Sequence, residues 1–338
     1  RNRIVAMSNK NIVLILFVFI GLLMSCAAVS DKELEKILRQ EGYAAKVREE
    51  TPGEMMVEVS RLTQNKLSKL VNLAPGMRYL VVYGGDVSDL EPLQKSNLRY
   101  LMVMDCPVTN LDPISRLNLS CLLLEHCPIR DFSPLTNMTL LEALSLYGCH
   151  VEDISFLKNL NLTFLSLRSN PNLSDLSAIN GKNLNNLDLS GTKISNIEAL
   201  KGMPLKRLDL SGTKISNIEA LKGMPLENLR MDNTSVSDIS VLHSMPLKQL
   251  HLGGTLVTDL SPLQGSSITY LDIRSTKVSD LEPLRGLPLE SLCFTQDGIT
   301  NGMEILRDMP SLYTLVGPFP VEFPVEKKRG DCKKEYDF

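Results

Sequence analysis

The sequence predicts an α/β solenoid, in which a parallel β-sheet lines the inner side of a curved stack and short helical or 3-10 turns form the convex side. The first indication is an internal duplication: LDLSGTKISNIEALKGMP occupies 187–204 and, letter for letter, 208–225. The second is that the same frame of 21–22 residues extends in both directions from this pair. A fixed period of this size is typical of repeat proteins, whose stacked units share one core.

The frame runs from Met77 to Ser311 and contains eleven units, each reading approximately L-x-x-L-x-L-x-x-[T/C/N]-x-[I/V]-x-[D/N]-[L/I]-x-x-L-x-x-x-P. Leucines at positions 4 and 6 alternate with outward residues, which predicts one face of a short strand. A single unit cannot bury these leucines, whereas parallel strands stacked about 4.8 Å apart bury them together. The units begin at Met77, Leu98, Leu119, Leu141, Leu162, Leu184, Leu205, Leu226, Leu247, Ile268 and Leu289.

This pattern resembles the leucine-rich repeat family, and its short form is similar to the class found in internalins and in phosphatase-regulator proteins. The resemblance covers residues 77–311 and implies a leucine-rich repeat horseshoe that binds rather than catalyses. Likeness to internalins implies adhesion to a host or neighbouring cell. Likeness to the regulators implies instead a cytoplasmic regulator of a phosphatase or kinase.

Residues 1–25 predict a lipoprotein signal peptide. Asn11 is followed by IVLILFVFIGLLM, an uncharged run too short to span a bilayer comfortably and typical of a signal-peptide core. Residues 23–26, Leu-Met-Ser-Cys, resemble the bacterial lipobox, which implies cleavage before Cys26 and lipidation of that cysteine. Ala27 after the cysteine favours the outer membrane in a Gram-negative species. An ordinary secretory signal and a retained membrane anchor are the alternatives.

Caps are expected at both ends of the stack: a lipidated N-terminus and N-terminal cap over 26–76, and a C-terminal cap or tail over 312–338. Residues 31–53 predict a helix followed by a turn, and 54–76 predict a degenerate first unit with Val57 and Val59 in its strand. The tail carries several prolines, so we expect it to cover the last unit without extending the sheet. The expected helical face carries Leu34, Ile37 and Leu38.

Composition and motifs argue against catalysis and against nucleic acid. The net charge of −3 does not provide the basic stripe that nucleic acid requires. The chain contains no phosphate-binding glycine loop, no G-x-S-x-G, no H-E-x-x-H and no kinase motif set. Its four histidines have no local acid–base partner in the sequence. We therefore expect no enzyme activity, no cofactor and no metal.

Two columns of the repeat frame could hold ions but are better explained as structural. Position 9 holds Cys106, Cys127 and Cys149, which could bind a metal with His126 and His150. Later units place asparagine or threonine there, which favours a ladder of small inward groups bonded to loop carbonyls. A disulfide between neighbouring cysteines is a further alternative. Position 13 is always Asp or Asn, and bonds to the turn's own amides explain this column without calcium.

The concave face is the candidate binding surface, because side chains at positions 3, 5, 7 and 8 leave the sheet on that side. Aromatic and methionine side chains gather in the first units, and such a patch is typical of an interaction site. We expect a protein or peptide partner, with burial under the cap or a second copy as the alternative. The apolar candidates are Tyr79, Tyr83, Tyr100, Met102, Met104, Leu123, Tyr147 and Phe164, and the charged ones are Asp188, Arg207, Asp209 and Arg230.

The sequence therefore predicts a non-enzymatic binding lipoprotein of the cell envelope, anchored to the membrane through Cys26. Charged side chains on the concave face would set orientation and association rate. A cytoplasmic regulatory scaffold and a self-assembling envelope lipoprotein remain the competing interpretations.

Overall fold

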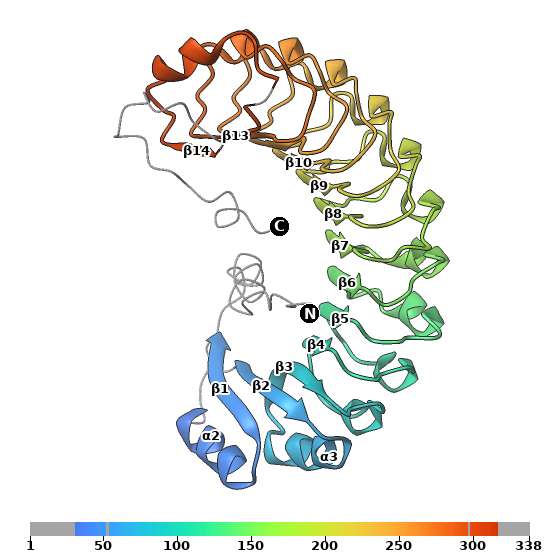
Figure 1. The fold of residues 1–338 in the computed structure, drawn as a ribbon. Coiled ribbons are helices and arrows are strands. Elements are labelled where there is room, and N and C mark those ends of the chain that lie inside the picture. The colour runs from blue at the N-terminus through green and yellow to red at the C-terminus, as the bar shows by residue number, and fades with distance from the viewer. Residues whose placement is uncertain (1–30, 52–53, 297, 317–338) are drawn as a thin grey trace, which may run out of the picture.

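The computed structural model describes residues 31–51, 54–296 and 298–316, which form an open, curved solenoid (Figure 1). One sheet follows the inner side of the arc, with its strands side by side in sequence order. This architecture is the predicted leucine-rich repeat solenoid. The strands are β1 (Ala44–Thr51), β2 (Glu54–Leu62), β3 (Met77–Gly85), β4 (Tyr100–Met104), β5 (Cys121–Glu125), β6 (Ala143–Tyr147), β7 (Phe164–Ser166), β8 (Asn186–Asp188), β9 (Arg207–Asp209), β10 (Asn228–Arg230), β11 (Gln249–His251), β12 (Tyr270–Ile273), β13 (Ser291–Phe294) and β14 (Thr314–Val316).

Each of the eleven units contributes one strand, from β3 to β13, and one 3-10 turn on the convex side. Proline stands in the first turn of five of these, where a missing N–H costs nothing. The turns are η1 (Glu91–Leu93), η2 (Asp112–Ile114), η3 (Ser133–Asn137), η4 (Ser155–Asn159), η5 (Ser177–Ile179), η6 (Glu198–Leu200), η7 (Glu219–Leu221), η8 (Ser240–Leu242), η9 (Ser261–Leu263), η10 (Glu282–Leu284) and η11 (Met303–Arg307).

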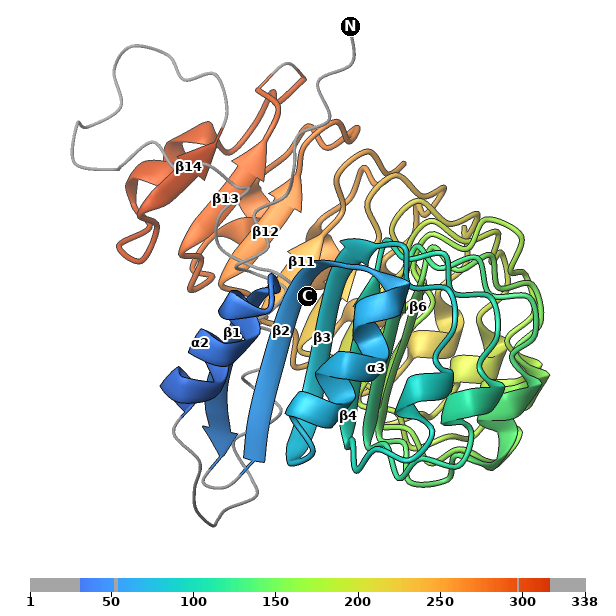
Figure 2. The same ribbon diagram turned by 90° about the horizontal axis from the view of Figure 1, so that it is seen from below.

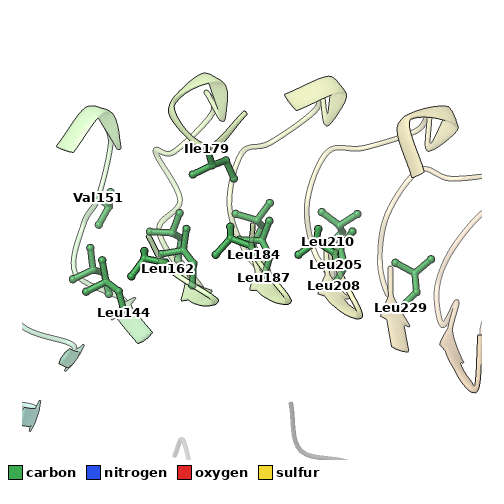
Figure 3. Close-up of a cluster of buried hydrophobic side chains, with 14 of the residues drawn as sticks. Leu144, Val151, Leu162, Ile179, Leu184, Leu187, Leu205, Leu208, Leu210 and Leu229 are labelled. Carbon is green, nitrogen blue, oxygen red and sulfur yellow. The ribbon is translucent and has the colours of Figure 1, made fainter. Parts of the chain in front are cut away.

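The main core lies between the sheet and the convex turns (Figure 3). Leu187, Leu208 and Leu229 occupy position 4 of three successive units, pair side by side in the sheet and are fully buried. Burying one such leucine contributes about 1.5–3 kcal/mol, so the repetition of the inward set provides most of the driving force for the stack.

The N-terminal cap differs from the prediction in its second half. Helix α2 (Asp31–Gln40) forms as expected and buries Leu34 and Leu38, although Ile37 stays 40% exposed. Residues 44–51 are the strand β1, antiparallel to β2, where a turn was expected. Ala45 and Val47 point into the core, and the Val47 N–H donates to the Glu35 carboxylate of α2 at 3.0 Å. The hairpin therefore closes the first edge of the main core, and α2 lies on its outer side (Figure 2).

Residues 54–76 fold like a modified repeat. Strand β2 is parallel to β3 and buries Val57 and Val59. Helix α3 (Gln64–Leu73) stands where the later units have a 3-10 turn. This end of the solenoid is therefore wider than the repeats that follow it (Figure 2).

The expectation that the C-terminal tail leaves the sheet unextended is wrong for its first residues. Thr314–Val316 form β14, which pairs in parallel with β13. The reason is that Leu312 and Leu315 repeat the inward positions 1 and 4 of the frame and are buried. The remainder of the tail, like residues 1–30 with the proposed signal peptide and Cys26, lies outside the described residues.

The Asp/Asn column at position 13 builds the convex turns. In ten of the units its side-chain oxygen accepts the N–H of the residue two positions on, at 2.8–2.9 Å. This is the Asx-turn arrangement. The oxygens that calcium would need are thus used to start the 3-10 turns.

The column at position 9 stabilises the loops that follow the strands. Thr213 donates to the Leu210 carbonyl at 2.6 Å, and Cys149 reaches the Leu124 carbonyl at 3.3 Å. Cys106, Cys127 and Cys149 are free thiols, so the proposed neighbour disulfides are absent. Burial raises the pKa of Cys127 to about 11 and that of Cys149 to about 12. At neutral pH the two buried thiols are therefore protonated, and each donates to a backbone carbonyl of the preceding unit.

Candidate functional site

The concave side of the first strands carries a second apolar cluster, separate from the main core. We call it the concave cluster. It comprises Met56, Tyr79, Val81, Tyr100, Met102, Met104 and Leu123, with Tyr83 and Cys121 packed against it. Six of the eight apolar residues predicted from the sequence belong to this cluster. Its separation from the leucine core follows from strand alternation, which sends odd and even positions to opposite faces.

Most of the concave cluster is buried, which corrects the expectation of an exposed patch. Tyr100 is 2% exposed and Met102 is fully buried, while Tyr79, Met104 and Leu123 are each 8% exposed. One physical cause of this burial is the parallel register of β3, β4 and β5, which places equivalent side chains next to one another so that they cover each other. Tyr79 and Tyr100 lie next to each other with ring centroids 5.8 Å apart. These five side chains therefore contribute to the stability of the fold.

Three of the predicted aromatic residues, Tyr83, Tyr147 and Phe164, keep part of their surface accessible. The Tyr147 ring contacts the His126 ring at 4.5 Å and lies 5.4 Å from the Arg168 guanidinium. His126 in turn contacts Asp105 through Nδ1 at 3.1 Å. The result is a half-buried aromatic ring bordered by ionisable groups, as is common at binding sites.

Glu125 is a buried carboxyl group at the edge of this region, in register with Tyr147 of the next strand. It is 7% exposed, and burial raises its pKa from an ordinary value of 4.5 to about 7. The neighbouring charges are His126 and Arg168, which lower that pKa, and Asp105, which raises it. Burial likewise raises the pKa of Tyr83 to about 12.

The two predicted aspartates of the central units are buried and serve the backbone. Asp188 accepts the Ser190 N–H at 2.9 Å, and Asp209 accepts the Ser211 N–H at 2.8 Å. These bonds turn the chain at position 7, which explains why β8 and β9 have three residues where β4 has five. Burial and the nearby Asp209 raise the pKa of Asp188. Arg207 is exposed beside this pair, whereas Arg230 is half-buried.

A third group of concave side chains was missed by the sequence analysis. Asp232, His251 and Asp272 lie on successive units, and one ligand atom from each lies within 4.8 Å of the others. His251 stacks on Tyr270 with ring centroids 4.5 Å apart. Burial, and secondarily Arg230 and Arg274, lower the pKa of His251 to about 3, so the imidazole is neutral. His251 and Asp272 share frame position 5 and Asp232 stands at position 7, so only a comparison across neighbouring units would have shown the group.

The fold resembles solved bacterial leucine-rich repeat proteins. An internalin from Listeria monocytogenes, InlF, matches with a TM-score of 0.67 and 24% identity over 86% of this chain and 83% of that chain. Internalin C2 of the same species matches with a TM-score of 0.42 and 27% identity over 55% of this chain and 76% of that chain. A leucine-rich repeat protein from Leptospira interrogans matches with a TM-score of 0.47 and 16% identity over 75% of this chain and 76% of that chain. The first likeness establishes an internalin-like leucine-rich repeat fold. No protein-family description and no curated protein matches the sequence.

Across residues 31–51, 54–296 and 298–316, every helix is too short or too polar to cross a bilayer.

Proposed function

We propose that this protein is a non-enzymatic lipoprotein of the bacterial cell envelope that binds a protein or peptide through its concave face. The observation that carries the proposal is the apolar side-chain cluster on the concave face, outside the leucine core, with Tyr83, Tyr147 and Phe164 partly accessible beside it. Leucine-rich repeat solenoids use such extended concave surfaces for binding.

In the proposed mechanism, the two halves of the concave face have different roles. The accessible aromatic rings would provide the apolar area that a partner covers, while the buried concave cluster holds them in place. Arg207 and Arg230 would attract and orient an acidic segment of that partner, which acts mainly on association rate. Asp188 and Asp209 would act indirectly, by fixing the turns that follow β8 and β9, the second of which contains Arg207.

An envelope location is supported by the lipobox-like residues 23–26 and by the state of one cysteine. Cys293 is disulfide-bonded. Disulfides persist in the periplasm or on the cell surface and are rare in the cytosol. This favours the envelope protein over a cytoplasmic regulator of a phosphatase or kinase.

Attachment through Cys26 is tested by metabolic labelling with a radioactive fatty acid in a bacterial host. We expect label on the wild-type chain and none on Cys26→Ser, because only the cysteine thiol accepts the diacylglycerol. Cys121→Ser is the matched control and should keep its label, since Cys121 lies within the described solenoid. An unlabelled wild-type chain, or a labelled Cys26→Ser chain, would contradict the anchor.

The binding face is tested with a photo-crosslinking amino acid in the native cell. Placed at exposed Arg207 on the concave side, it should yield a defined adduct with a partner. Placed at Lys222, beside the convex turn η7, it should not. Introducing Tyr147→Ala into the chain with the crosslinker at position 207 should lower the adduct yield about tenfold, as expected when an interface hot-spot residue is truncated. The melting temperature should not change.

Two outcomes of this experiment would overturn the binding proposal. Equal adducts from both positions would exclude a specific concave interface. Adducts with a second copy of the chain would favour the self-assembling lipoprotein instead.

A further inference from the structure

The group formed by Asp232, His251 and Asp272, called here the Asp–His–Asp site, has the composition and spacing of an ion-binding site. Its members come from three neighbouring units of the concave sheet, and their candidate ligand atoms all lie within 4.8 Å of one another. His251 and Asp272 occupy the same register position of β11 and β12. Movements of side chains alone could therefore bring the three groups onto one cation.

His251 presents a buried ring nitrogen to this site. The residue is 8% exposed, and its Nε2 atom is buried without a hydrogen-bond partner among the described residues. A buried polar nitrogen without a partner is unfavourable because it has lost its hydrogen bonds to water, so such an atom usually has a bound partner. Stacking on Tyr270 holds the imidazole plane in place. An imidazole nitrogen fixed in this way is a common metal ligand.

Gly253 keeps space open between the two carboxylates. A Cβ at this position would lie 2.8 Å from Asp232 Oδ1 and 3.7 Å from Asp272 Oδ1. The same position holds larger side chains in the neighbouring units, Asp232 before it and Arg274 after it. The glycine therefore leaves a small space where an ion could meet both oxygens.

Both carboxylates are also held by the groups around them, as metal-binding carboxylates usually are. Asp232 accepts the Gly253 N–H at 2.9 Å and the Ser211 hydroxyl at 3.3 Å. Asp272 accepts the Arg274 Nη2 at 2.5 Å through Oδ2 and the Arg274 backbone N–H at 3.0 Å through Oδ1. Arg274 Nε contacts both oxygens at 3.0 Å. A cation would have to share Asp272 with Arg274, which limits the expected affinity.

We propose that the Asp–His–Asp site binds one divalent transition-metal ion, through His251 Nε2 and one oxygen each from Asp232 and Asp272. One nitrogen and two oxygen ligands suit zinc, cobalt or manganese, whereas calcium and magnesium prefer oxygen alone. Three protein ligands leave a coordination position for water on the concave side. The inference goes beyond the binding function proposed above and does not depend on it.

The test is calorimetric titration of the 338-residue chain, freed of metal, with Zn²⁺. We expect one equivalent to bind, and binding to weaken at least tenfold in His251→Gln and in Asp232→Asn. Gly253→Ala removes no ligand but fills the space, and it should weaken binding similarly. Titration with Co²⁺ should give visible absorption bands that His251→Gln abolishes.

His126→Ala is the matched control, because His126 contacts one carboxylate, Asp105, on the same face but is exposed. This variant should bind Zn²⁺ like the wild type. Thermal melts without metal verify that each variant is folded. The proposal is overturned if Zn²⁺ does not bind at micromolar concentration, if the folded His251→Gln and Gly253→Ala variants bind it unchanged, or if His126→Ala loses the same equivalent.

Discussion

Replacing Asn170 by alanine is expected to destabilise the solenoid by about 3–5 kcal/mol, at the upper end for single substitutions. Asn170 is fully buried, and its amide oxygen accepts the Val151 N–H at 2.8 Å. Its amide nitrogen donates to three carbonyls, those of Leu146 at 2.9 Å, Leu167 at 2.8 Å and Arg168 at 3.2 Å. Alanine would leave the Val151 N–H and the Leu167 carbonyl without these partners, at about 1–3 kcal/mol each, while the Leu146 and Arg168 carbonyls keep backbone N–H donors.

Urea unfolding followed by circular dichroism measures this effect. Thr213→Val is the matched control, because Thr213 occupies the same frame position but makes one hydrogen bond, to Leu210. It should cost about 1 kcal/mol. Equal losses in the two variants would mean that water replaces the Asn170 amide, and that the asparagine does not join neighbouring units.

The fold was predictable because its information is repeated along the sequence. Every unit carries an inward leucine at position 4 and an apolar residue at position 6, so the pattern is recognisable even where one unit departs from it. The cap at 44–51 has no such support. Its sequence AAKVREET offers only Ala45 and Val47 as inward apolar residues, and its strand state depends on pairing with β2, which is a tertiary contact.

The face of the sheet on which the candidate site lies was predictable from the sequence, but the exposure of its side chains was not. Alternation along a strand places Tyr79 and Tyr100 on the concave face. Their burial depends on contacts across neighbouring strands, which a one-unit pattern does not contain. The grouping of His251 with Asp232 and Asp272 was missed for a related reason, because the two aspartates come from different units. Such groups could be found in the sequence by comparing the residues at the outward frame positions of adjacent units.

Glu125→Gln is expected to stabilise the protein above pH 7, by up to about 3 kcal/mol, since each pKa unit corresponds to about 1.4 kcal/mol. The folded state raises the pKa of this carboxyl group to about 7, mainly through burial. Between pH 4.5 and 7 the folded protein therefore holds a proton that the unfolded chain has lost. The free energy of unfolding contributed by Glu125 then falls as pH rises through this window. Glutamine keeps the shape and cannot ionise.

The measurement is the free energy of unfolding of wild type and Glu125→Gln at pH 4.5, 6 and 8. The difference between them should grow with pH and level off above pH 7. Glu142→Gln, which changes an exposed carboxylate in the following unit, should shift stability little at any pH. Parallel curves for wild type and Glu125→Gln would mean that the carboxylate is hydrated in the folded protein. The concave face beside Tyr147 would then be wetter and more open than the structure describes.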